Sequence, residues 1–136
     1  MAFLPYKFDG SVRPQSLHYL PAAAITPKVG MALTWDATGD AGVLNKTGTT
    51  GQPDYIAMTE RSAALTAGDY IPVLKVTPDI IFETKLSADY SGIKAGTKVV
   101  LSSDGLGLGT STSSGKALVE SFDGKTAGAK VRVRFV

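Results

Sequence analysis

Two apolar runs, Tyr70-Ile-Pro-Val-Leu-Lys-Val76 and Ile80-Ile-Phe-Glu-Thr84, flank the short segment Thr77-Pro-Asp79. Both runs are rich in β-branched and aromatic residues, which are typical of strands. The segment between them carries a proline and an aspartate, which favour a turn. We therefore expect two consecutive strands. Pro72 within the first strand predicts an edge position or a bulge, because proline cannot donate to a β-ladder.

The chain after residue 21 repeats this organisation, with short apolar or alternating runs between segments rich in Gly, Asp, Ser and Thr. No segment carries a convincing amphipathic-helix pattern, and the best helical candidate, Thr59–Leu65, would form at most about two turns. The Gly and Ser/Thr tract Gly105–Gly115 is predicted to be a long flexible loop. Further strands are expected at Met31–Trp35, Val43–Leu44, Tyr55–Met58, Lys98–Leu101, Ala117–Ser121 and Ala129–Val136. This pattern predicts an all-β fold, a compact barrel or sandwich of short strands.

Three segments share Ala-Gly followed by one residue and a predicted strand. Their glycines are Gly68, Gly96 and Gly128. Glycine adopts a positive φ without steric cost, which allows a sharp turn into a strand. The three segments represent either a worn repeat or, as we favour, one turn solution used three times.

The N-terminal segment, residues 1–21, differs from the rest in carrying Pro5, Pro14 and Pro21 among apolar and aromatic side chains. Prolines disfavour a helix, and the segment is too apolar for an ordinary disordered tail. Two interpretations stay open: an extended arm that docks on a partner, or an arm that folds back over its own domain. In the first, residues 22–136 form a single β-barrel domain, and deletion of residues 2–20 leaves that domain folded while abolishing partner binding. The predicted contact residues of this arm are Phe3, Leu4, Tyr6, Phe8, Leu17, His18 and Tyr19.

The composition argues against an enzyme. The 136-residue chain has no cysteine and a single histidine, which excludes thiol chemistry and a multi-histidine metal site. Its three glutamates are few for a pair of catalytic carboxylates. The tract Gly105-Leu-Gly-Leu-Gly109 lacks the spacing and the following helix of a dinucleotide-binding loop. We therefore predict no catalytic residues, no metal ligands and no cofactor.

Charge and hydropathy give no indication of nucleic acid or membrane as a partner. The net charge is only +2. The one basic concentration, Lys130, Arg132 and Arg134, alternates with apolar residues as on the solvent face of a strand. No apolar stretch approaches the ~18 residues that span a bilayer, and the N-terminus has no signal-peptide pattern. We expect a protein made in a cytoplasm and either retained there or released by lysis.

The order of these features resembles that of small tailed-bacteriophage capsid decoration proteins, also called cement or head-stabilisation proteins. The matching segments are Tyr19–Ala23, Val29–Leu33, Pro53–Met58, Ala67–Val73, Ile81–Thr84, Ala95–Val99 and Ala127–Phe135. The resemblance implies a compact β-barrel of the β-tulip kind that is often a homotrimer. It implies a place on the outer surface of the virion, where such proteins staple neighbouring subunits of the major capsid protein. In several such families an N-terminal arm adds a strand to the capsid protein, and residues 2–21 would be the matching element.

A second class of function is a glycan- or receptor-binding β-domain, or the capsid-anchoring base of a head fibre. It predicts a shared aromatic patch, for which Tyr70, Tyr90 and Trp35 are the candidates, although the strand context of Trp35 and Phe82 favours a core position for both. An enzyme is the third class, and it would depend on His18 or on a carboxylate pair.

Overall fold

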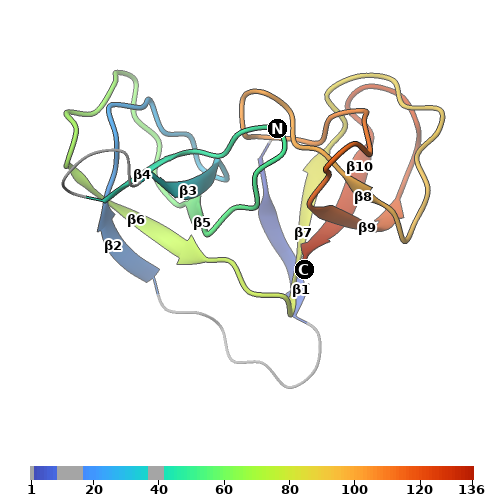
Figure 1. Ribbon diagram of the computed structural model, residues 1–136, viewed down its shortest axis with the longest axis horizontal. Coiled ribbons are helices and arrows are strands. Elements are labelled where there is room, and N and C mark those ends of the chain that lie inside the picture. The colour runs from blue at the N-terminus through green and yellow to red at the C-terminus, as the bar shows by residue number, and fades with distance from the viewer. Residues whose placement is uncertain (1, 9–16, 37–41) are drawn as a thin grey trace.

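The computed structural model describes residues 2–8, 17–36 and 42–136, and the side chains of Lys7 and Phe8 lie outside this description. The described part is all-β, with two five-stranded antiparallel sheets packed together as a compact sandwich that is not a closed barrel (Figure 1). The strands are β1 (Leu4–Phe8), β2 (Leu17–Pro21), β3 (Ala32–Asp36), β4 (Val43–Lys46), β5 (Tyr55–Ala57), β6 (Tyr70–Lys75), β7 (Ile80–Lys85), β8 (Lys98–Val99), β9 (Ala117–Phe122) and β10 (Lys130–Phe135).

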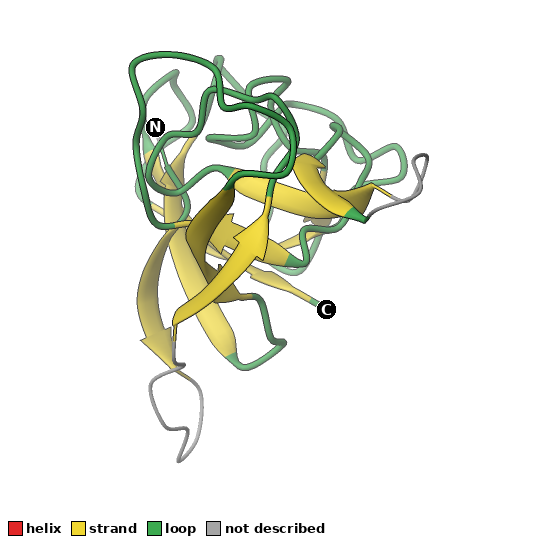
Figure 2. Ribbon diagram, turned by 90° about the vertical axis from the view of Figure 1, so that its left-hand side faces the viewer, coloured by secondary structure: helices red, strands yellow, loops and turns green. Residues whose placement is uncertain are grey.

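The sheets have the strand orders β1-β7-β10-β9-β8 (sheet A) and β2-β6-β5-β3-β4 (sheet B). Sheet B curls, so that a single bridge joins Ala22, just after β2, to Leu44 of β4. Most of the loops gather at one end of the molecule, above the sheets in Figure 2. The segment Thr59–Leu65, the best helical candidate of a sequence without a convincing helix pattern, is irregular. Its Arg61 and Leu65 N–H groups instead donate to the carbonyls of Pro27 and Ile25, which ties the loop to a neighbouring one.

Two apolar cores follow from the alternation of the strands. In β10, Val131, Val133 and Phe135 are buried while the residues between them face outward. The core between the sheets centres on three fully buried rings, with Phe135 at 5.5 Å from Phe3 and 5.8 Å from Phe82 between ring centroids. The core position predicted for Phe82 is thus confirmed. The second core fills the concave side of sheet B and includes Leu33, Leu44, Ile71 and Val73.

The N-terminal segment is part of both sheets. β1 pairs with β7 at the edge of sheet A, and β2 pairs with β6 at the edge of sheet B. Phe3 is fully buried, and its N–H donates to the carbonyl of Gly30. Of the two interpretations left open by the sequence, the one in which this segment folds back on its own domain describes the structure. Residues 9–16 of the predicted arm lie outside the described residues.

Pro72 occupies an inner strand, not the predicted edge, because β6 lies between β2 and β5. The register of β6 with β5 ends at Val73 opposite Ala57. The Pro72 carbonyl accepts from the Met58 N–H, and the N–H and C=O of one strand residue face the same side. A backbone N–H at position 72 would therefore point past the last paired residue of β5. Its absence in proline costs the ladder between β5 and β6 no hydrogen bond.

The tract Gly105–Gly115 is irregular, as its composition predicts, but its first part is anchored in the two cores. Leu108 is fully buried in the core between the sheets, and Leu106 is buried in the second core. Asp104 fixes the turn that leads into this tract, because its Oδ1 accepts hydrogen bonds from the Ser102 hydroxyl and from the Leu106 N–H, the latter at 2.9 Å. Burial is the largest single influence and raises the pKa of Asp104, but the hydrogen bonds and positive charge that favour the carboxylate, with these two hydrogen bonds foremost, together outweigh it and leave the pKa below its usual value.

The three turn glycines have positive φ angles, at 96° for Gly68 and 84° for both Gly96 and Gly128. At Gly96 a Cβ would meet no atom within 4 Å, so conformational strain is the main cost of a side chain there. We expect Gly96→Val to lower the free energy of unfolding by about 1–2 kcal/mol, measured by urea unfolding. The matched control is Gly48→Val, which has equally open space without a positive φ. Equal midpoints for the two variants would contradict the argument from strain.

Candidate docking surface

The residues predicted as arm contacts are divided among the core and two sheet edges. Phe3 is a core residue and is therefore not available to a partner, and the side chain of Phe8 lies outside the described residues. Leu4 and Tyr6 are exposed on β1. The remaining three residues, Leu17, His18 and Tyr19, are all exposed on β2.

The free edge of β2 presents backbone hydrogen-bonding groups to solvent. Tyr19 of β2 lies opposite Pro72 of β6. The Pro72 carbonyl points toward β5, so Tyr19 and Pro72 form a pair that is not hydrogen-bonded between β2 and β6. The N–H and C=O of Tyr19 therefore face away from β6, and the same alternation turns those of Leu17 outward. No backbone group among residues 2–8, 17–36 and 42–136 pairs with them.

Apolar side chains accompany this edge. Leu17 and Tyr19 share one face of β2, and Tyr70 of β6 lies opposite Pro21 on that same face. The exposed fractions are 51% for Leu17, 67% for Tyr19 and 65% for Tyr70, which is high for large apolar residues in strands. We call these three side chains and the free edge of β2 the β2 strip. In Figure 1, β2 lies at the lower left, away from sheet A.

The other three edge strands are less suited to pairing with a further strand. β8 spans only two residues. β4 is partly covered, because the Ala23 N–H donates to the Leu44 carbonyl at 2.8 Å. β1 carries Pro5 and a register shift between Pro5 and Lys7. A short strand, a covered edge, a proline and a bulge all discourage edge-to-edge association. Among the edge strands in the described structure, only β2 has five regular pairs and none of these protections before its last residue, Pro21.

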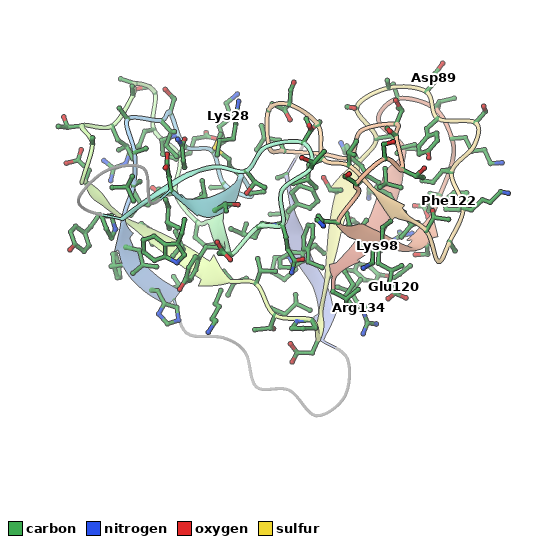
Figure 3. The ribbon with its side chains drawn as sticks, viewed as in Figure 1. Lys28, Asp89, Lys98, Glu120, Phe122 and Arg134 are labelled. Carbon is green, nitrogen blue, oxygen red and sulfur yellow. The ribbon has the colours of Figure 1, made fainter. Side chains whose placement is uncertain are left out.

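The outer face of sheet A is occupied by ion pairs. Arg132 reaches Asp123 with both terminal nitrogens, at 2.6 and 3.1 Å, and Glu83 with Nε at 3.1 Å. Its guanidinium also lies 5.1 Å from the ring centroid of Tyr6. Arg134 pairs with Glu120 at 2.8 Å (Figure 3). Both arginines of the predicted basic strand thus face acids on neighbouring strands, which agrees with the expected solvated face.

The Arg132 hydrogen bonds lower the pKa of Asp123 below its usual value. A lowered folded-state pKa contributes stability above the unfolded pKa, and this stability is lost as pH falls through the folded pKa. We expect Asp123→Asn to lower Tm at pH 7. This difference from the parent begins to shrink as the pH falls below about 4, near the pKa of an unfolded aspartate, and vanishes below the lower pKa of the folded state. Thermal unfolding from pH 7 to pH 2 measures it. A difference that stays constant over this range would contradict an electrostatic role for Asp123.

The three aromatic residues of the predicted glycan patch do not come together. Tyr70 belongs to the β2 strip, Tyr90 packs against the core between the sheets, and Trp35 lies on β3. The core position predicted for Trp35 is wrong, since 42% of it is exposed. Leu33, two residues earlier on the same face, is fully buried, and Trp35 lies just beyond the limit of that core. Trp35 contacts Tyr55, a position that the sequence does not single out because one tyrosine in a short strand carries no distinguishing signal.

Within the described ranges no group of three or more His, Asp or Glu side chains is placed to hold a metal ion. The part of the chain that the structure describes contains no helix that could cross a membrane.

Comparison with known proteins does not assign the chain: no protein family matches it, and no curated protein matches it.

Proposed function

We propose that this chain is a structural virion protein that binds the outer surface of a tailed-phage capsid and staples neighbouring copies of the major capsid protein. The observation that carries the proposal is the β2 strip, a regular open strand edge flanked by exposed Leu17, Tyr19 and Tyr70. The motif order that resembles capsid decoration proteins supports the choice of partner. The low net charge of +2 fits a partner that is protein more than one that is DNA.

The mode of binding that fits this surface is addition of a capsid strand to sheet B. The outward N–H and C=O groups of Leu17 and Tyr19 pair with an extended segment of the partner, and their side chains contact its alternate residues. This differs from a free arm that inserts into the capsid protein, because residues 4–8 and 17–21 already belong to the two sheets. The capsid protein therefore supplies the added strand.

The energy of stapling comes from repeated small interfaces. An interface of standard size buries about 800 Å² on each partner. We propose a homotrimer, following the resemblance, because three linked copies of the β2 strip would bind far more tightly than one through effective concentration. No catalytic step is needed, since binding energy shared between capsid subunits stabilises the expanded shell.

Two substitutions at one position test this mode of binding. Tyr19→Ala removes the exposed ring and is expected to weaken binding to purified capsids about tenfold. Tyr19→Pro also removes the outward N–H, and because that N–H faces away from β6 no hydrogen bond within sheet B is lost. We expect Tyr19→Pro to bind at least about tenfold more weakly than Tyr19→Ala, in a cosedimentation titration.

Trp35→Ala is the control, because Trp35 is an exposed aromatic residue outside the β2 strip. It is expected to bind capsids as the parent does, and unchanged Tm values verify that all variants fold. Equal capsid binding by the parent and both Tyr19 variants would contradict docking through the β2 strip.

A further inference from the structure

A pocket opens on the second core, the apolar interior of sheet B. It is lined by Met31 and Leu106, which are buried members of that core, and by Ile25, which packs against it. The volume of the pocket is about 290 Å³, close to the lower end of the ~300–1,000 Å³ range of small-molecule sites. A small ligand with an apolar part fits these dimensions.

The pocket lies at one end of the curled sheet. Met31 directly precedes β3 and Lys46 is the last residue of β4, and both lie at the same end because the two strands are antiparallel. Toward the other end of β3, the rings of Trp35, Tyr55 and His18 follow one another in edge contacts, with centroids 6.0 and 6.1 Å apart. The end at Met31 thus resembles the mouth of a small β-barrel, where ligand sites are common.

Charged side chains form the rim of the pocket. Lys46 crosses Gly105, where a Cβ would lie only 3.0 Å from the Lys46 Cγ and 3.5 Å from the Met31 Cγ. Lys28 belongs to the loops above β3 (Figure 3). In the described part of the chain, no acid pairs with either ammonium group. One acid, Asp104, also lines the pocket and is ionised at neutral pH, so the rim carries a net charge of +1.

We propose that this pocket binds a small monocarboxylate with a short alkyl chain. The carboxylate lies between the ammonium groups of Lys28 and Lys46, and the chain covers Met31 and Leu106. Ammonium groups donate charge-assisted hydrogen bonds to a carboxylate, and each buried CH₂ group adds to the affinity. Asp104 restricts the ligand to one negative charge, because a second carboxylate would be repelled by this acid.

This site is independent of the β2 strip. Leu20 of β2 packs against the second core, so Leu17 and Tyr19, which alternate with it, differ in the face of the sheet that they occupy: His18 and Leu20 share one face, and Leu17 and Tyr19 share the other. Tyr19→Pro should therefore bind the carboxylate normally even where it fails on capsids, which distinguishes the two sites.

Three small probes test the proposal on the full-length protein by amide NMR titration at constant ionic strength. Hexanoate has the chain and the negative charge, acetate has the charge without the chain, and hexylammonium has the chain with a positive charge. We expect hexanoate to shift the amide signals of Met31, Lys46 and Leu106 saturably, with a Kd of about 1 mM. Acetate should bind at least about tenfold more weakly, and hexylammonium should give no saturable shift at these positions.

A double variant tests the two lysines. Lys28→Met with Lys46→Met keeps the apolar stems and removes both charges, and we expect it to bind hexanoate at least about tenfold more weakly at unchanged Tm. The matched control is Lys75→Met with Lys94→Met, which changes the net charge equally at two exposed lysines outside the pocket and should bind as the parent does. No saturable shift with hexanoate up to about 20 mM, equal affinity for hexanoate and hexylammonium, or equal hexanoate binding by the two double variants would overturn the proposal.

Discussion

Deletion of residues 2–20 is expected to leave a chain that does not fold. The deletion removes β1 from sheet A, most of β2 from sheet B and the fully buried Phe3 from the core between the sheets. Burial of one phenylalanine contributes about 3–5 kcal/mol, a large fraction of the ~5–15 kcal/mol that stabilises a typical domain. This reverses the expectation from the sequence that residues 22–136 form an independent domain. Circular dichroism and urea unfolding of the truncated chain measure the effect.

A point variant makes the same test without removing strands. We expect Phe3→Ala to lower the free energy of unfolding by about 3–5 kcal/mol, because the Phe3 ring packs on Phe135 in the core. Leu4→Ala is the matched control, because Leu4 is the next residue along the chain and is 46% exposed. We expect it to change the free energy of unfolding by no more than about 1 kcal/mol. A truncated chain that unfolds cooperatively with the parent's midpoint, or equal effects of the two alanine variants, would contradict the integration of this segment into the fold.

Gly115→Ala is expected to have the second large effect. A Cβ at Gly115 would lie 2.6 Å from the Lys98 carbonyl oxygen and 2.6 Å from the Val99 carbonyl carbon. Both atoms belong to the backbone of β8, so relief requires β8 to move away from β9, while the Val99 side chain is fully buried. We expect a loss of about 3 kcal/mol in the free energy of unfolding, seen as a lower urea midpoint at unchanged slope.

Gly48→Ala is the control for this substitution, because a Cβ there meets nothing within 4 Å. Its effect should stay within about 0.5 kcal/mol. If Gly115→Ala unfolds at the same urea concentration as Gly48→Ala, the close approach of Gly115 to β8 is not rigid, and the packing described for the Gly105–Gly115 tract is wrong.

The elements that could be predicted from the sequence are those whose signal is local. The apolar alternation of residues 130–135 indicates one buried face, and Val131, Val133 and Phe135 occupy it. The Ala-Gly turns depend on the φ angle of a single residue, and positive φ at Gly68, Gly96 and Gly128 agrees with the repeated pattern. Local chemistry decides such features, so one sequence is sufficient to recognise them.

The parts that the sequence did not reveal depend on distant partners. The composition of residues 2–21 is equally suited to a strand added to another protein or to β6 and β7 of the same chain, and only the pairing distinguishes them. The Gly105–Gly115 tract has the composition of a loop, yet Leu106 and Leu108 find buried positions between remote segments. The exposure of Trp35 is decided by where the second core ends, which strand periodicity does not encode.

Quantitative mass spectrometry of phage particles, purified from the lysate of cells that produce this chain, tests the central claim most directly. The measured quantity is the copy number of the chain relative to the major capsid protein. A capsid decoration protein that covers the shell predicts a ratio near one or a simple fraction of it. Absence of the chain from the particles, or a handful of copies in each, would contradict the proposed function.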